Sequence, residues 1–421
     1  MIKLFIQNRN FRSMTFFTTF GGIGRGMFSI FMMWAIHAMY QNPMYTGIAG
    51  FMFGAPLVVS FIVGPFVDRW DKVKVLRAVE FTKFCVVTLM LLSHLFLDLG
   101  PWFFFLAILV FSGATMFGGP AATAMLPRIV DGEDLVKANV LMNILGIIGG
   151  VGLGAILLTM SAGELNFTQF YGVIAALLLI ASLFTLFFRY KEPAALASET
   201  NKTALKVYLS ELWEGFVFVK KGAMLFFTIA VVSMNFFARV AYVNFPMLAE
   251  THLGSASGYM LLSFLALTGG LVGSYICRVV ENKFKLWVIL AASFVFAGVA
   301  RILFVNIISD NLARAILMYV IYVGLSTAIG IFYQVLIQKL PPKNLISRVD
   351  TITTSLAFTT AAIGALAGGL LGTILYVNTV FFIQGGAYIA IGVLVCFSKH
   401  IRALPKISEL GKFDNSILPK M

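Results

Sequence analysis

The sequence predicts an all-α membrane protein in which twelve transmembrane helices form two pseudo-symmetric halves of six. Hydrophobic residues make up 60% of the 421 residues and charged residues only 12%, whereas soluble domains contain about 25% charged residues. A lipid bilayer can cover that much apolar surface, and each helix that crosses it needs roughly 20 apolar residues. The protein is therefore expected to act on something that moves across or within a membrane.

Twelve apolar stretches are long enough to form these helices. Each is expected to be helical because lipid offers no hydrogen bonds to an open sheet or an irregular segment. The predicted spans are, in chain order, 11–39, 44–66, 78–97, 102–125, 139–160, 168–189, 223–248, 257–279, 286–308, 313–337, 351–375 and 379–398.

The distribution of Lys and Arg predicts how the chain is oriented. Three of the 31 basic residues are assigned to spans (Arg25, Arg239 and Arg301), Arg314 to a loop on one side, and the others to the termini and alternate loops. Short cytoplasmic loops retain Lys and Arg, so both termini are predicted to be cytoplasmic, in the inner (cytoplasmic) cell membrane. Dispersed basic loops favour membrane lipids as partners and exclude nucleic acid, and the protein is expected to be a monomer.

A long polar interval divides the spans six and six. The expected organisation is an N-terminal half (1–190), a cytoplasmic linker with an amphipathic helix around Trp213 (191–222), a C-terminal half (223–400) and a cytoplasmic tail (401–421). Internal repetition supports a duplicated six-helix unit, which in transporters places the substrate site between the halves near the bilayer midplane.

Residues at matching places in the two halves carry this repetition. Arg25 in the first span and Arg239 in the seventh are as far apart in sequence as the Leu-Pro pairs that begin at Leu126 and Leu340. The fifth and eleventh spans are both rich in glycine, which is typical of closely packed membrane helices.

Three stretches resemble the major facilitator superfamily, and within it the branch of macrolide-efflux and enterobactin-exporting proteins. They are Gly64-Pro65-Phe66-Val67-Asp68-Arg69-Trp70-Asp71-Lys72, the segment from Gly119-Pro120-Ala121 to Lys137-Ala138-Asn139, and Glu214-Gly215-Phe216-Val217-Phe218. The resemblance implies the major facilitator fold and secondary active transport by alternating access. It also implies efflux by an antiporter, of the kind that confers multidrug resistance.

The first of these stretches suggests a cytoplasmic gate. Asp68 stands at a helix end and could accept hydrogen bonds from the N-terminus of the eleventh span, where partial positive charge accumulates. Arg69 and Arg128 could pair with Asp350 and Asp134 to hold that side closed. The candidate gating residues are therefore Gly64, Asp68, Arg69, Arg128, Asp134 and Asp350. The alternative is a solvated charged loop.

Arginines inside spans are candidates for the substrate site. A charge near the bilayer centre costs about 2.5–3.5 kcal/mol on insertion scales and usually marks a pathway or a paired interior site. Arg25 and Arg239 occupy equivalent places, so they could converge on a central cavity and bind a carboxylate, phosphate or sulfonate bidentately. Arg301 has no equivalent partner. Alternatively, each arginine hydrogen-bonds helix carbonyls or amide side chains within the bundle.

Other polar residues of the spans could line the same cavity. The candidates are Asn143, Asn235, Tyr242, Tyr333 and Gln334. No Asp or Glu is assigned to the middle of a span, so a proton, if one is coupled, is expected to bind His37, a gate acid or the substrate. His37 can titrate near neutral pH, although an interfacial polar residue is the alternative.

These observations favour an exporter of amphipathic compounds (macrolide, siderophore or peptide type) that is driven by a proton gradient. One alternative is an anion-selective carrier or a flippase for an anionic lipid, because three cations and no acid are assigned to the spans. A second is a membrane sensor or scaffold that binds without transporting. The glycine run Gly21–Gly26 lacks the strand and the Lys-Ser/Thr ending of a nucleotide loop. Neither an enzyme nor a cofactor or metal is therefore expected.

Overall fold

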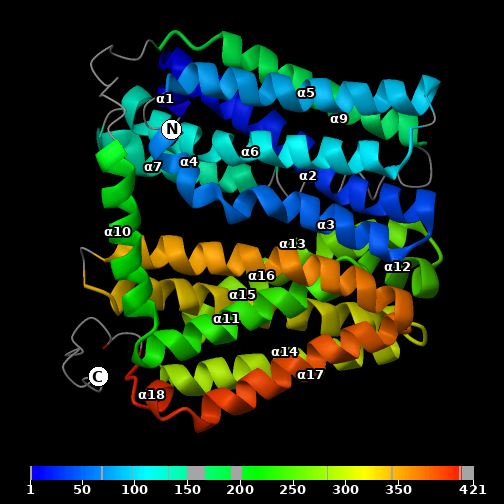
Figure 1. Cartoon of the computed structure of the whole chain (residues 1–421), viewed down its shortest axis with the longest axis vertical. Coiled ribbons are helices and arrows are strands. Elements are labelled where there is room, and N and C mark those ends of the chain that lie inside the picture. The colour runs from blue at the N-terminus through cyan, green and yellow to red at the C-terminus, as the bar shows by residue number, and fades with distance from the viewer. Residues whose placement is uncertain are drawn as a thin grey trace. The chain divides into compact units, whose positions relative to one another are not determined.

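The computed structural model is helical throughout the part of the chain that it describes (Figure 1). It describes residues 2–67, 70–97, 99–130, 132–147, 149, 166–190, 202–281, 283–342, 345–406 and 409. Nine helices in these ranges are long and apolar enough to cross a membrane. The all-α membrane fold is thereby confirmed.

The chain divides into two compact units. Contacts group Met1–Glu199 with Gly254–Phe264, and Thr200–Leu253 with Leu265–Met421. The proposed domain boundaries at 190 and 222 remain predictions, because residues 191–201 lie outside the described residues.

The first unit contains the six N-terminal spans. Span one corresponds to α2, span two to α3 and α4 together, span three to α5, span four to α6 and span six to α9. Span five (139–160) begins in α7, and residues 150–165 lie outside the described ranges. The bounds are α1 (Ile2–Gln7), α2 (Arg9–Tyr40), α3 (Pro43–Val58), α4 (Ser60–Val67), α5 (Lys72–Phe96), α6 (Pro101–Ile129), α7 (Gly132–Ile147) and α9 (Phe167–Leu186).

Side chains at the N-caps explain where several of these helices begin. The first backbone N–H groups of a helix have no partner within it, and a short polar side chain can accept from them. Asn8 accepts from the N–H of Phe11 at 2.9 Å, and Asp71 from that of Lys74 at 3.1 Å. Asn166 and Gln169 form a reciprocal capping box at α9. Asp71 of the signature loop therefore has a local structural role.

Close helix contacts hold the first unit together. α9 packs against both α2 and α5, and α6 packs against α3 and α5. At the α2–α9 contact an ideal Cβ on Gly24 would lie 3.0 Å from the Leu178 side chain, so the glycine allows the approach. Phe16 and Phe184 stack with ring centroids 4.7 Å apart across the same pair of helices.

The second unit contains the remaining six spans and a preceding helix. Its bounds are α10 (Lys202–Val219), α11 (Gly222–Tyr242), α12 (Phe245–Leu253), α13 (Ala256–Val280), α14 (Leu286–Ile307), α15 (Leu312–Lys339), α16 (Ile346–Ile374), α17 (Val377–Phe397) and α18 (Lys399–Arg402). α13 is divided between the two units at Phe264.

The same helix pairings recur in the two units. α5 packs against α6 and α9, as α14 packs against α15 and α17; α2 packs against α7, as α11 packs against α16. Glycines allow the α11–α16 approach, because a Cβ on Gly364 or Gly368 would overlap the backbone of Phe236 or Val240. This recurrence agrees with the repetition in the sequence.

Two predicted spans are interrupted. The second divides at Val59, three residues after Pro56, whose ring nitrogen cannot donate a helical hydrogen bond. The seventh (223–248) divides after Tyr242, and the buried Asn244 at this break donates to the carbonyls of Val240 at 2.9 Å and Gly368 at 2.8 Å. The break thus interrupts the backbone hydrogen bonds of the helix and adds a hydrogen bond to α16.

The predicted amphipathic helix is α10. It packs against α16, and Glu214 forms an ion pair with Arg348 there. Leu212 is buried, whereas the Trp213 side chain is 62% exposed and Val217 is exposed as well. These two apolar residues remain available to lipid or headgroups, as on helices that lie along a membrane surface.

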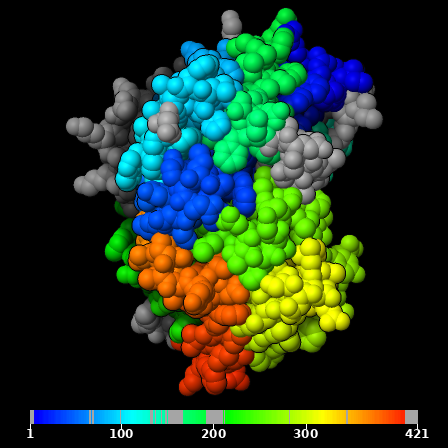
Figure 2. Space-filling model, turned by 90° about the vertical axis from the view of Figure 1, so that its right-hand side faces the viewer, coloured from blue at the N-terminus to red at the C-terminus, as the bar shows by residue number. Residues whose placement is uncertain are grey.

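Figure 2 shows the molecule from the side on which α2 turns into α3 (blue) and α16 turns into α17 (orange). Aromatic side chains are exposed at turns of this kind: Trp102 at the start of α6 is 71% exposed and Tyr376 before α17 is 89% exposed. Trp and Tyr gather where membrane helices meet water, so these residues suit a membrane–water interface.

Gly368 offers a test of the α11–α16 packing. Gly368→Ala should destabilise the protein by about 1–3 kcal/mol, because its methyl group would overlap Val240. The matched control is Gly386→Ala, whose Cβ would meet nothing within 4 Å; helix propensity there favours Ala by about 1 kcal/mol. The apparent Tm of each detergent-purified variant measures its stability. Equal Tm values for Gly368→Ala and Gly386→Ala would contradict the packing argument.

Candidate functional site

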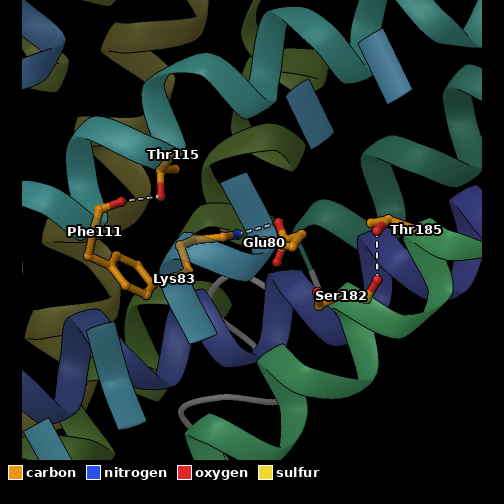
Figure 3. A network of polar contacts seen from close by, with 6 residues as sticks. All are labelled: Glu80, Lys83, Phe111, Thr115, Ser182 and Thr185. Atoms are coloured by element: carbon orange, nitrogen blue, oxygen red, sulfur yellow. Dashed lines mark hydrogen bonds and ion pairs between the residues drawn. The ribbon is translucent and has the colours of Figure 1, made fainter. Parts of the chain in front are cut away.

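A buried ion pair lies on α5, which corresponds to the third span of the first unit. Glu80 and Lys83 are 3% and 4% exposed, and the Lys83 ammonium donates to Oε1 of Glu80 (Figure 3). The two side chains meet because residues three apart share one face of a helix. Neither charge could be buried alone at low cost, but the pair is neutral as a whole.

The second carboxylate oxygen of Glu80 has no hydrogen-bond donor within the described part of the chain. Its Oε2 is buried and faces α2, where a Cβ on Gly21 would lie 3.2 Å away. Figure 3 shows that nearby hydroxyls are engaged elsewhere: Thr115 donates to the Phe111 carbonyl and Thr185 to that of Ser182. Glu80 therefore retains an open position for a proton or a donor.

A small cavity adjoins this oxygen. It has a volume of about 120 Å³, and Glu80, Lys83, Thr115 and Arg25 are among its lining residues. Arg25, on α2, is exposed to this space. With Glu80 ionised, the cavity therefore has two cations and one anion on its walls. The structure thus places the predicted site residue Arg25 beside a carboxylate that the sequence analysis did not select.

Glu80 and Lys83 correct two expectations from the sequence. Lys83 was counted with the loop cations although it falls within the third predicted span (78–97), and no Asp or Glu was assigned to the middle of a span; Glu80 and Lys83 both lie within α5 and are buried. The available signal was an acid and a base three residues apart at the start of the apolar run that ends at Phe96. Such a pair is neutral, so it can enter a membrane helix where a single charge is disfavoured.

The second unit contains a larger pocket of about 490 Å³. Helices α11, α12, α14 and α15 supply its lining, which is aromatic and polar. The lining residues are Asn235, Ala238, Arg239, Tyr242, Phe245, Arg301, Tyr319, Tyr322, Val323, Ser326 and Thr327. No Asp or Glu belongs to this described lining, so the fixed charge of the pocket wall is positive.

Arg301 is enclosed by aromatic rings. It is 1% exposed, and its guanidinium carbon lies 4.4–5.8 Å from the centroids of five rings. Such contacts stabilise a cation through the negative faces of the rings. The rings are those of Phe245, Phe304, Tyr319, Tyr322 and Phe381.

An amide fixes the orientation of this guanidinium. Nε of Arg301 donates to the side-chain oxygen of Gln384 at 2.7 Å, and the amide nitrogen of Gln384 donates to the hydroxyl of Tyr322 at 2.7 Å. Arginine can only donate, so the oxygen of the fully buried Gln384 must face it. The chain Arg301–Gln384–Tyr322 therefore links α14, α17 and α15.

Four of the predicted substrate residues meet at this pocket: Asn235, Arg239, Tyr242 and Arg301. The exposed Arg239 lies with its guanidinium carbon 5.2 Å from the Tyr242 ring centroid. Asn235, one turn earlier on α11, donates to the Val231 carbonyl at 2.9 Å, which leaves its side-chain oxygen available to the pocket.

The other predicted lining residues lie elsewhere. Tyr333 and Gln334 are on α15 but do not line the pocket, and Gln334 donates to Asp350 at 3.2 Å. The side chain of Asn143 lies outside the described residues.

The predicted gating residues are described only in part. Asp68, Arg69 and the surroundings of Gly64 lie outside the described residues. Arg128 is exposed near the end of α6. Asp134 forms an ion pair with Lys137 at 2.8 Å, and this hydrogen bond and charge lower the pKa of the Asp134 carboxyl.

His37 is buried within the protein. It is 3% exposed, and its ring centroid lies 5.8 Å from that of Trp34. No group of three His, Cys, Asp or Glu residues in the described ranges could hold a metal ion.

A wider hollow of about 730 Å³ lies between α5 and α6, with Asp71 and Lys74 as its charged residues. Asp71 caps α5, and the other lining residues are mostly apolar. None of the predicted site residues lines this hollow, and its apolar walls are suited to lipid.

Comparison with known proteins identifies relatives of most of the chain. The family model of the Major Facilitator Superfamily matches residues 14–358. The uncharacterised MFS-type transporter YvqJ of Bacillus subtilis (strain 168) is 27% identical over 236 residues, which are 54% of this chain and 55% of that relative. Macrolide efflux protein A of Streptococcus pyogenes is 23% identical over 362 residues, 84% of each chain. The solved structure of the nucleoside transporter NupG covers 92% of this chain and 98% of its own, with a TM-score of 0.69 and 15% identity.

The buried pair can be tested through stability. Glu80→Gln should destabilise the protein by about 3–5 kcal/mol, because Lys83 then remains charged and buried without its partner. Adding Lys83→Met should restore most of the loss. Apparent Tm values of purified variants measure these changes.

The exposed Asp134–Lys137 pair has the same spacing on its helix and provides the control. Asp134→Asn should leave the Tm unchanged, because exposed pairs contribute little. The buried-pair argument fails if Glu80→Gln alone is as stable as the double variant.

Proposed function

Because the chain belongs to the major facilitator superfamily, whose members are secondary transporters, we propose that it exports amphipathic compounds of the macrolide, siderophore or peptide kind. In this proposal the protein works by alternating access and uses a proton gradient. It lies in the cytoplasmic membrane as a monomer with both termini in the cytoplasm, as the distribution of Lys and Arg predicts.

The pocket of the second unit is the observation that carries the proposal. Its aromatic faces offer apolar contact to a ring system, while Asn235, Ser326 and Thr327 offer hydrogen bonds. Ligand sites typically combine a mainly apolar wall with a few polar groups that fix orientation. A volume of about 490 Å³ falls in the range of small-molecule sites, roughly 300–1,000 Å³.

Similarity to macrolide efflux protein A of Streptococcus pyogenes, across 84% of both chains, supports export over import. It also supports a macrolide as the first substrate to test.

Glu80 is the proposed proton acceptor. Its Oε2 is buried and open to the small cavity, so a proton can arrive there without displacing Lys83 first. Once Glu80 is neutral, its attraction for Lys83 falls and the cavity has two uncompensated cations, Lys83 and Arg25. Such a change in net charge in a medium of low dielectric can alter helix packing around α5. The helices packed against α5 are α9 and α6.

The gate proposed from the sequence remains part of this mechanism. Asp68 and Arg69, with Arg128, Asp134 and Asp350, would hold the cytoplasmic side closed in one state. Breaking these contacts would then accompany opening.

An anion-selective carrier or anionic-lipid flippase is the second candidate. The observation that favours it is the positive lining of the 490 Å³ pocket, to which Arg239 and Arg301 contribute and no described acid does. The two candidates share a site and differ in the charge of the substrate.

Flux measurements in everted membrane vesicles test the export proposal. With an acidic lumen, the protein should accumulate radiolabelled erythromycin inside, because protons leaving the lumen drive the exchange. A protonophore should abolish the accumulation. Vesicles that bind erythromycin but never accumulate it would instead favour a sensor.

The coupling residue can be tested by separating net transport from exchange. The Glu80→Gln/Lys83→Met variant should lose accumulation driven by the pH gradient and keep erythromycin counterflow, which needs no net proton movement. His37→Gln should retain both activities. The opposite result, in which only His37→Gln loses gradient-driven accumulation, would assign coupling to His37.

A further inference from the structure

Arg301 is a buried cation for which the described part of the chain supplies no anion. Its guanidinium is in contact with rings and one neutral amide, and no carboxylate forms an ion pair with it. The Nη1 atom is buried and makes no hydrogen bond. Each buried donor left unpaired has a substantial desolvation cost, so the site as it stands is incompletely satisfied.

The aromatic rings and Gln384 reduce this cost without removing it. Cation–π contacts act on the faces of the guanidinium, whereas Nη1 needs an acceptor in the plane of the group. Gln384 already accepts from Nε and donates to Tyr322, so it has no second oxygen to offer. No side chain around Arg301 accepts from Nη1 in the structure, so an acceptor from outside this set of side chains would satisfy it.

The 490 Å³ pocket is the route by which such an acceptor can reach it. Arg301 lines this pocket together with Arg239, which is exposed and lies on α11. A pocket with two guanidinium groups and no described acid attracts anions, and arginine binds carboxylates, phosphates and sulfonates through paired hydrogen bonds.

We propose that Arg239 and Arg301 form an anion subsite, so that the transported compound is an amphipathic anion whose acidic group binds between them. Phe245, Tyr319 and Tyr322, the rings around Arg301 that line the pocket, contact the apolar part of the same molecule. The inference rests on the proposed function in taking this pocket as the substrate site. It narrows the substrate class from amphipathic compounds to those with a carboxylate, phosphate or sulfonate, which includes siderophores and peptides and excludes erythromycin.

A soluble organic acid and a lipid headgroup share this chemistry. Both present an anionic oxygen group next to an apolar body, and the pocket lining is suited to either. The experiment therefore includes one probe from each source.

Binding of 2-naphthalenesulfonate and of its neutral sulfonamide tests the subsite in phosphatidylcholine nanodiscs. Wild-type protein should bind the sulfonate at least about tenfold more tightly, as expected for hydrogen bonds to a charged group. In Arg239→Gln and in Arg301→Gln this ratio should fall to near one. Arg314→Gln, which removes an exposed arginine at the start of α15 outside the pocket, should keep the wild-type ratio.

Arg239→Gln keeps the test decisive if Arg301→Gln does not fold, because Arg239 is exposed and its loss leaves no buried donor. An unchanged ratio in folded Arg239→Gln, or equal affinity of wild-type protein for both probes, would overturn the proposal. Displacement of the sulfonate by lysophosphatidylglycerol, with none by lysophosphatidylcholine, would identify a lipid headgroup as the source. Displacement by neither lipid, with the tenfold preference intact, would identify a soluble anion.

Flux separates this inference from the export proposal. Sulfonate preference without erythromycin accumulation would support the anion subsite and count against macrolide export. Erythromycin accumulation by a protein without any anion preference would support macrolide export and count against the anion subsite.

Discussion

The cost of placing a charge in an apolar medium is the constraint on which the interior of this protein depends. Each helix satisfies its own backbone, so the remaining polar groups must find partners between helices. The third span of each unit meets this constraint differently. On α5, Glu80 neutralises Lys83 within one turn, whereas on α14 Arg301 is held by one ring of its own helix and by four rings and an amide of neighbouring helices. The Glu80–Lys83 pair forms within one helix, whereas the surroundings of Arg301 form only when several helices have packed together.

These two solutions have different consequences for function. A neutral ion pair responds to a proton, because protonation of the carboxylate leaves the ammonium uncompensated. A cation held by aromatic faces keeps its charge and its in-plane donors, so it responds to an anion. The proposed coupling site and the proposed substrate site thus follow from the kind of partner that each buried charge has.

Close helix packing sets the geometry in which those charges meet. Glycines at the α2–α9 and α11–α16 contacts let backbones approach, and Gly21 leaves room for the free oxygen of Glu80. The break between α11 and α12 brings Phe245 to the guanidinium of Arg301, while Asn244 donates to the carbonyl of Val240 at the break and to that of Gly368 on α16. Small residues and one helix break therefore prepare the space around each charge.

The sequence by itself determined the helical membrane class and the repetition between halves, and it predicted twelve spans, because apolar length and residue spacing are local properties of the chain. It also selected Asn235, Arg239 and Tyr242, whose spacing on one helix predicts a shared face. Only the tertiary structure decided which charges have partners. Helical periodicity cannot report that Gln384 meets Arg301, that five rings from four helices enclose it, or that Gly21 faces Glu80. All of those contacts except that of Phe304 join residues far apart in sequence, and the energy of a buried charge depends on all of them together.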